Sequence, residues 1–160
     1  MEESTQRVIL TSRAIRELVP TPWDRHKFVT AVGVFRCRSI SLAPVESTAL
    51  RSLPCGLWVA FEDRDEIVYD AASSEYQIDQ AIMHEVGHMV LDHHAQGVAF
   101  GALAELLPDI DLTALKFVMA RSNFDDAQES EAELFADLVM ASAVSPFRRS
   151  SVMTDFWGRQ

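Results

Sequence analysis

The hydrophobic positions near the start of the chain recur with the spacing of α-helices. Apolar residues three to four positions apart extend over about residues 11–19, and this pattern ends at Pro20, which cannot continue a helix. The same spacing returns over residues 23–37. The pattern therefore predicts two N-terminal helices within residues 1–37.

The next hydrophobic stretches are short and predict strands. Residues 39–45 alternate weakly between apolar and polar side chains. Residues 56–61 and 67–69 are apolar and lie on either side of the charged segment 62–66, which is the pattern of a β-hairpin. We therefore expect a small antiparallel or mixed sheet.

A longer helical pattern follows the expected hairpin. Ser73 or Ser74 can cap its N-terminus, and apolar residues then recur on one face as far as Val90. Further along, the spacing predicts helices over about residues 112–121 and 125–144. Residues 96–107 are apolar but interrupted by glycine, and their form is not assigned. Helices packed on a small sheet give an α+β fold.

Composition narrows the class of protein. The 160 residues suit one domain, and 48% hydrophobic with 24% charged residues is typical of a globular chain. The net charge of −10 comes with no basic stripe, so we expect no direct contact with nucleic acid. The N-terminus lacks the pattern of a secretory signal, and Glu105 breaks the longest apolar stretch, so we expect a cytoplasmic protein without a membrane span.

The expected central helix contains the run His84-Glu85-Val86-Gly87-His88, which is the H-E-x-x-H pattern. Histidines four positions apart on a helix point to the same side, so both imidazoles can reach one tetrahedral Zn²⁺. Glu85 then lies beside the metal without binding it and is the candidate general base for catalysis. The two cysteines form no C-x-x-C pair, so the sequence indicates no cysteine zinc site.

A catalytic zinc site needs a third protein ligand, and the acidic helix downstream offers one. Glu129 and Glu133 lie on one face of that helix, with small alanines near them, whereas Glu131 points away. Our order of preference is Glu129 and then Glu133. The other of these two is expected to accept a hydrogen bond from a ligand histidine.

Two further candidates for the third ligand follow the motif itself. His94 lies ten residues after His84, as in the extended motif H-E-x-x-H-x-x-G-x-x-H, but Leu91 stands where that motif has glycine and favours continued helix. Otherwise His93 and His94 are expected to be polar residues at the helix C-terminus. Asp92, one turn beyond His88, is the weaker candidate.

Two blocks of this sequence resemble the ImmA/IrrE family of small metallopeptidases, which are gluzincin-like proteins associated with phage repressors and stress-response regulators. The first block is residues 82–94, similar to the family's H-E-x-G-H followed by apolar residues and a histidine. The second is residues 129–136, similar to E-x-E-A-x-x-F-A. Glu133 departs from the Asn or Asp that the family often carries. The resemblance covers about residues 56–144.

The resemblance implies a zincin-like minimal metallopeptidase domain over residues 1–160, with its core at 56–144. It implies a zinc-dependent endopeptidase that cuts a protein substrate, namely a helix-turn-helix transcriptional repressor. In this reading His84, His88 and Glu129 hold the zinc, and Glu85 takes a proton from the attacking water. The sequence offers Tyr69, Tyr76 or a residue further downstream as a second hydrogen-bond donor to the developing oxyanion and does not choose among them. The alternative is a zinc-containing regulatory module that binds and switches a partner without cutting it.

Overall fold

A computed structural model describes residues 2–46, 56–93, 115–119 and 124–144 of the chain. The described part is α+β, as the sequence predicts. Its elements in chain order are α1 (Glu2–Arg16), α2 (Arg25–Arg36), β1 (Ser39–Val45), β2 (Leu57–Phe61), β3 (Arg64–Asp70), α3 (Glu75–Val90), β4 (Leu115–Met119) and α5 (Asp126–Val144).

The strands form one mixed sheet with the order β1-β3-β2-β4. The expected hairpin is present: β2 and β3 are antiparallel, with Trp58 opposite Ile67. β1 pairs with β3 in parallel, and β4 pairs with β2 antiparallel. Pro44 lies in β1, at the edge of the sheet, where a missing backbone donor is tolerated.

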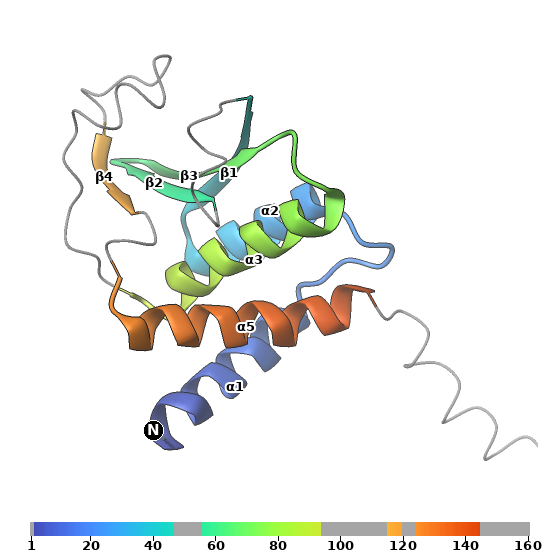
Figure 1. Cartoon of the computed structure of the whole chain (residues 1–160), viewed down its shortest axis with the longest axis vertical. Helices are drawn as coiled ribbons and strands as arrows, with labels where there is room; N and C mark the ends of the chain where they lie inside the picture. The colour runs from blue at the N-terminus through green and yellow to red at the C-terminus, as the bar shows by residue number, and fades with distance from the viewer. Residues whose placement is uncertain (1, 47–55, 94–114, 120–123, 145–160) are drawn as a thin grey trace, which may run out of the picture.

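The helices lie on one side of the sheet in successive layers (Figure 1). α2 packs on β1, and α3 packs on β3. α5 covers α3 on the side away from the sheet, and α1 packs on α5. The hydrophobic core therefore runs from the sheet through α3, with Ile82, Met83 and Val86 fully buried.

Side chains define where the two inner helices begin. The carboxylate of Asp24 accepts a hydrogen bond from the backbone N–H of Lys27 at the start of α2. Ser74 and Gln77 form a capping box at the start of α3, so the second of the two candidate serines is the cap. These caps satisfy backbone donors that a helix N-terminus otherwise leaves exposed.

One predicted helix is wrong in its described part. Residues 115–119, within the stretch 112–121, form strand β4 instead. This stretch is too short to form a stable isolated helix, and its aromatic and β-branched residues suit a strand that gains backbone hydrogen bonds from β2. The first helix also starts earlier than predicted, at Glu2, and ends at Arg16. Residues 96–107 lie outside the described part.

A buried carboxylate ties α2 and its C-terminal turn to the hairpin. Asp65 on β3 is fully buried, and its carboxylate lies 2.7 Å from Nη1 of Arg36 and 3.0 Å from Nε of Arg38. Arg36 also stacks over Trp58 of β2. Two guanidinium groups thus compensate one buried charge.

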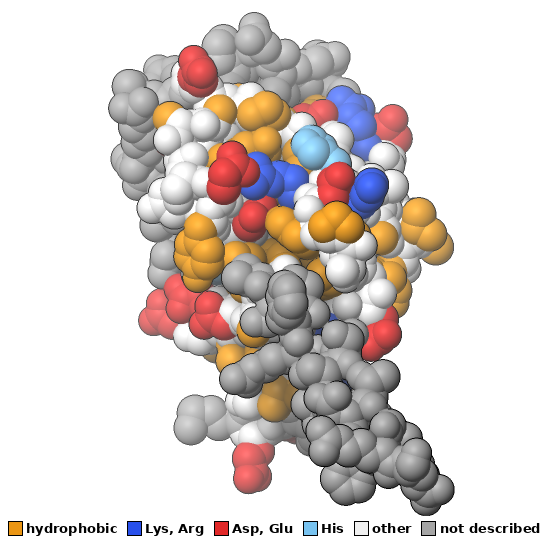
Figure 2. Space-filling model, turned by 90° about the vertical axis from the view of Figure 1, so that its right-hand side faces the viewer, with side chains coloured by type: hydrophobic (Ala, Val, Ile, Leu, Met, Phe, Trp, Pro, Cys, Tyr) orange, Lys and Arg blue, Asp and Glu red, His pale blue; other side chains and the backbone are white. Residues whose placement is uncertain are grey.

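Figure 2 presents one face of the molecule, on which acidic and basic side chains are interspersed with scattered hydrophobic ones. Within the residues coloured there, the basic side chains do not gather into a stripe. In the described part of the chain, none of the helices combines the length and apolar character that crossing a membrane requires.

Candidate metal centre

The central helix α3 brings the two motif histidines together. His84 and His88 are both buried, and their Nε2 atoms lie 3.0 Å apart. The distance follows from the helix itself, because residues four positions apart lie on the same face. Both nitrogens therefore point to the same place.

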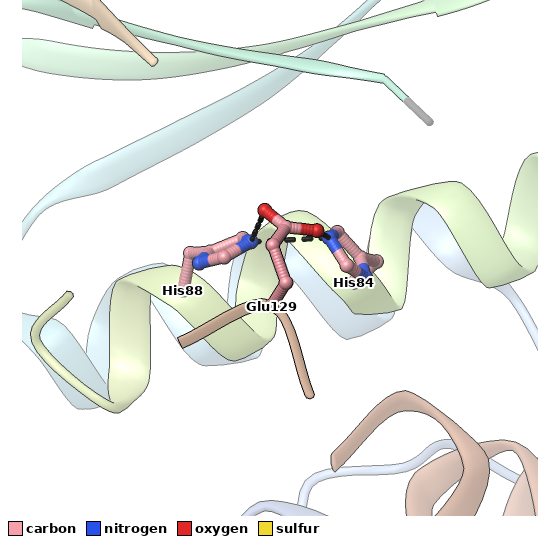
Figure 3. A group of neighbouring side chains, drawn as sticks. All are labelled: His84, His88 and Glu129. Carbon is pink, nitrogen blue, oxygen red and sulfur yellow. Dashed lines mark hydrogen bonds and ion pairs between the residues drawn. The ribbon is translucent and has the colours of Figure 1, made fainter. Parts of the chain in front are cut away.

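α5 supplies a carboxylate at that place. Glu129, in the first turn of α5, lies with Oε2 3.4 Å from Nε2 of His84 and Oε1 3.4 Å from Nε2 of His88 (Figure 3). Together, His84, His88 and Glu129 form a group that could hold a metal ion. The structure thus brings together the three residues that the sequence favoured as ligands.

Close packing of the two helices makes this approach possible. A Cβ atom added to Gly87 would lie 3.0 Å from the ring of Phe135 and 3.3 Å from Cα of Ala132. The absence of a side chain at Gly87 and the small side chain at Ala132 let α5 lie directly against α3. Gly87 therefore has a packing role that opposes its cost of about 1 kcal/mol in a helix interior.

The spacing of the donor atoms is close to that of a tetrahedral zinc site. Ligand atoms at about 2.0 to 2.2 Å from a tetrahedral centre are separated from one another by about 3.3 to 3.6 Å. Each imidazole Nε2 lies 3.4 Å from a different oxygen of Glu129, which is within this range, and the two Nε2 atoms lie 3.0 Å apart, which is slightly shorter. Two imidazoles and one carboxylate leave one position of a tetrahedron for water or substrate, which is typical of catalytic zinc sites.

Glu85 is buried next to this group. Burial is the main cause that raises the pKa of its carboxyl well above the usual range, and the negative charge of Glu129 adds to the effect. The backbone N–H of Trp58 donates a hydrogen bond to Glu85. Its Oε2 atom has no hydrogen-bond partner in the described structure. Buried polar atoms of this kind are few in native proteins, and a catalytic role is one explanation for them.

His88 is held in its neutral form. Burial, with smaller contributions from His84 and His93, lowers the pKa of His88 to about 2. Phe124, just before α5, stacks on the imidazole with ring centres 3.7 Å apart. Neutral imidazole is the form that binds metals, so His88 needs no deprotonation before it can act as a ligand.

The C-terminus of α3 differs from the prediction. The helix does not continue through Leu91: Asp92 adopts a left-handed conformation with φ of 55°, and the N–H of His93 donates to the carbonyl of His88. This is a Schellman turn, which folds the chain back over the last helical turn. His93 is consequently buried rather than a polar residue at an exposed helix end.

The turn places His93 between a metal-ligand candidate and α5. Nδ1 of His93 lies 2.9 Å from Nδ1 of His88, and Nε2 of His93 lies 2.8 Å from Oε2 of Glu131. Burial lowers the pKa of His93, although the carboxylate of Glu131 opposes this effect. Hydrogen bonds from Ser4, His93 and Arg7 outweigh partial burial and lower the pKa of Glu131 to about 2.

The structure does not place Glu133 in the expected role of a carboxylate next to a ligand histidine: the second ring nitrogen of His88 contacts His93, and Glu131 contacts His93 in turn. Glu133 is exposed, whereas Glu131 turns toward His93 and α1. Helical spacing relative to Glu129 could not reveal this contact, because α1 and the turn after α3 surround Glu131. Among the other candidates, Tyr69 is buried, Tyr76 is exposed, and His94 lies outside the described residues.

The comparisons with known proteins assign no family. The chain matches no family model, no curated protein and no solved structure.

Proposed function

We propose that this protein is a zinc-dependent metallopeptidase of a zincin-like type. The observation that carries the proposal is the convergence of the two imidazole Nε2 atoms and the carboxylate of Glu129, with each nitrogen 3.4 Å from one carboxylate oxygen, in a group that could hold one metal ion. The similarity of residues 82–94 and 129–136 to the ImmA/IrrE pattern supports the same reading.

The donor set favours a transition-metal ion such as zinc over calcium and magnesium. Calcium and magnesium prefer six or more oxygen ligands, whereas this group offers two imidazole nitrogens and one carboxylate. When bound, zinc supplies a Lewis acid that polarises a carbonyl group and lowers the pKa of water. His84 and His88 would hold the ion from one helix, and Glu129 would hold it from the other.

Glu85 is the proposed general base and acid. Its buried position raises its affinity for a proton, so it can accept one from the attacking water and pass it to the leaving amine of the cleaved peptide. The Trp58 N–H fixes one side of the carboxylate. A cation bound at the neighbouring histidines would keep Glu85 ionised before the reaction, because opposite charge lowers a carboxyl pKa.

The proposed substrate is a peptide bond in a protein, and the family resemblance suggests a helix-turn-helix repressor. The test compares the zinc-loaded wild type with Glu85→Gln on a peptide library prepared from a proteome. New peptide termini are counted by mass spectrometry, and zinc content is measured in both proteins. We expect cleavage by the wild type and at least a roughly 100-fold loss in Glu85→Gln, with zinc retained. Zinc binding without any cleavage that depends on Glu85 would instead favour the regulatory module.

A further inference from the structure

The contacts of His88 continue beyond the proposed metal site to the N-terminus of the chain. Nε2 of His88 faces Glu129, and its other ring nitrogen, Nδ1, faces His93. His93 in turn faces Glu131, which Arg7 contacts at 2.7 Å and to which the hydroxyl of Ser4 donates. Residues from three helices and one turn thus form a continuous chain of polar contacts.

The direction of the hydrogen bonds in this series of contacts follows from Glu131, the carboxylate at its end. Glu131 is paired with the guanidinium of Arg7, so its carboxylate is an acceptor. His93 must then donate to it through Nε2–H, which leaves Nδ1 of a neutral His93 as an acceptor. His88 accordingly donates through Nδ1–H, and its Nε2 carries the lone pair.

We infer that His93 and Glu131 are positioning residues for His88. They hold its imidazole in the tautomer that directs the Nε2 lone pair toward the metal, while α1 holds Glu131. This inference rests on the proposed metal site. It makes α1, which lies far from the motif in sequence, part of the metal centre.

The surroundings of His88 support a positioning role. Phe124 stacks on the face of the ring and restricts its tilt, whereas His93 contacts the ring edge and sets its rotation. The backbone hydrogen bond from His93 to the His88 carbonyl ties the two residues together a second time. Partners of this kind orient metal ligands, and their loss typically weakens metal binding about 10- to 100-fold.

The first test measures zinc affinity by competition with a chromophoric chelator. The proteins are the wild type, His93→Phe, Glu131→Ala, the double variant and, as a matched control, Glu133→Ala on the exposed side of the same helix. We expect roughly 10- to 100-fold weaker binding in each single variant and an unchanged control. Because the two residues act in series, the double variant should lose little more than the weaker-binding single variant.

The outcomes separate this inference from the proposed function. A wild type that binds no zinc would overturn both. A wild type that binds zinc, together with His93→Phe or Glu131→Ala that binds within about twofold of it, would overturn only the positioning role. Losses that add fully in the double variant would also contradict a serial arrangement.

A spectroscopic measurement needs no variant and covers the case in which His93→Phe does not fold. Long-range ¹H–¹⁵N correlation spectra of the imidazole rings, recorded after zinc removal, identify which nitrogen carries the proton. We expect Nδ1–H for His88 and Nε2–H for His93. The reverse assignment, with Nε2–H on His88, would overturn the inference whatever the zinc affinity.

Discussion

Two of the places where the described part of the protein buries carboxylates compensate the negative charge in different ways. Asp65 lies between the guanidinium groups of Arg36 and Arg38, so the chain provides its own cations. Glu129 faces instead the imidazoles of His84 and His88, of which burial holds His88 neutral. The negative charge of Glu129, together with burial, raises the pKa of Glu85.

The difference separates a structural ion cluster from the proposed metal site. Burial of a charge is costly unless a partner compensates it, and at Asp65 the partners are covalently part of the fold. At the α3–α5 site the arrangement of donors suits a cation that comes from outside the chain. The ion cluster at Asp65 should therefore govern stability, and the α3–α5 site should govern metal binding.

Among the substitutions that test this difference between the two sites, Glu129→Gln should have the largest effect, and the effect should be on zinc affinity. The substitution keeps the size of the side chain but removes its negative charge, so zinc affinity should fall roughly 100-fold or more, beyond the loss typical of residues that only support a ligand. Isothermal titration with zinc measures this change. Equal affinity in the variant and the wild type would mean that Glu129 is not a ligand.

Asp65→Asn should have the opposite effect: it should lower the free energy of unfolding and leave zinc affinity unchanged. The two arginines lose their charged partner, and we expect a loss of about 2 to 3 kcal/mol in the free energy of unfolding, since both guanidinium groups keep some contact with water. Urea unfolding of the zinc-free protein measures it. Zinc at about 100 times its dissociation constant should then stabilise wild type and variant equally, by about 2.7 kcal/mol. A variant with normal stability and weakened zinc binding would contradict the assignment of stability to the Asp65 cluster and of zinc binding to the α3–α5 site.

Gly87→Ala should affect both properties by a smaller amount. The added methyl group gains helix propensity of about 1 kcal/mol, but it meets Phe135 and the backbone of Ala132. We expect a net loss of about 1 kcal/mol in stability and a several-fold weaker zinc affinity, because α5 must move Glu129 away from the histidines. Thermal unfolding and chelator competition measure the two effects. A stabilised variant with normal zinc binding would show that the helices do not need this close approach.

Local patterns in the sequence predicted those features that a single element determines. Three predicted features depend only on short stretches of sequence, and all three are present. They are the spacing of His84 and His88, the capping of α3 by Ser74 and the β2–β3 hairpin. The prediction of Glu129 as the residue facing the histidines also agrees with the structure, because α5 is long and regular.

Features that depend on tertiary contacts were not predictable in the same way. Strand β4 depends on pairing with β2, and residues 112–121 alone gave a helical pattern. The contact between His93 and Glu131 requires a left-handed residue at Asp92, a position where glycine is the usual signal, together with the packing of α1 on α5. No residue pattern near His93 or Glu131 predicts that these two side chains are in contact.

The most direct test of the central claim is the zinc content per chain, measured by elemental analysis of the purified wild type, Glu129→Ala and Glu133→Ala. The two glutamates lie four residues apart on α5, but only Glu129 faces the histidines. We predict about one zinc per chain in the wild type and in Glu133→Ala, and almost none in Glu129→Ala. A wild type that takes up no zinc, or a Glu129→Ala protein that keeps it fully, would contradict the proposed metal centre.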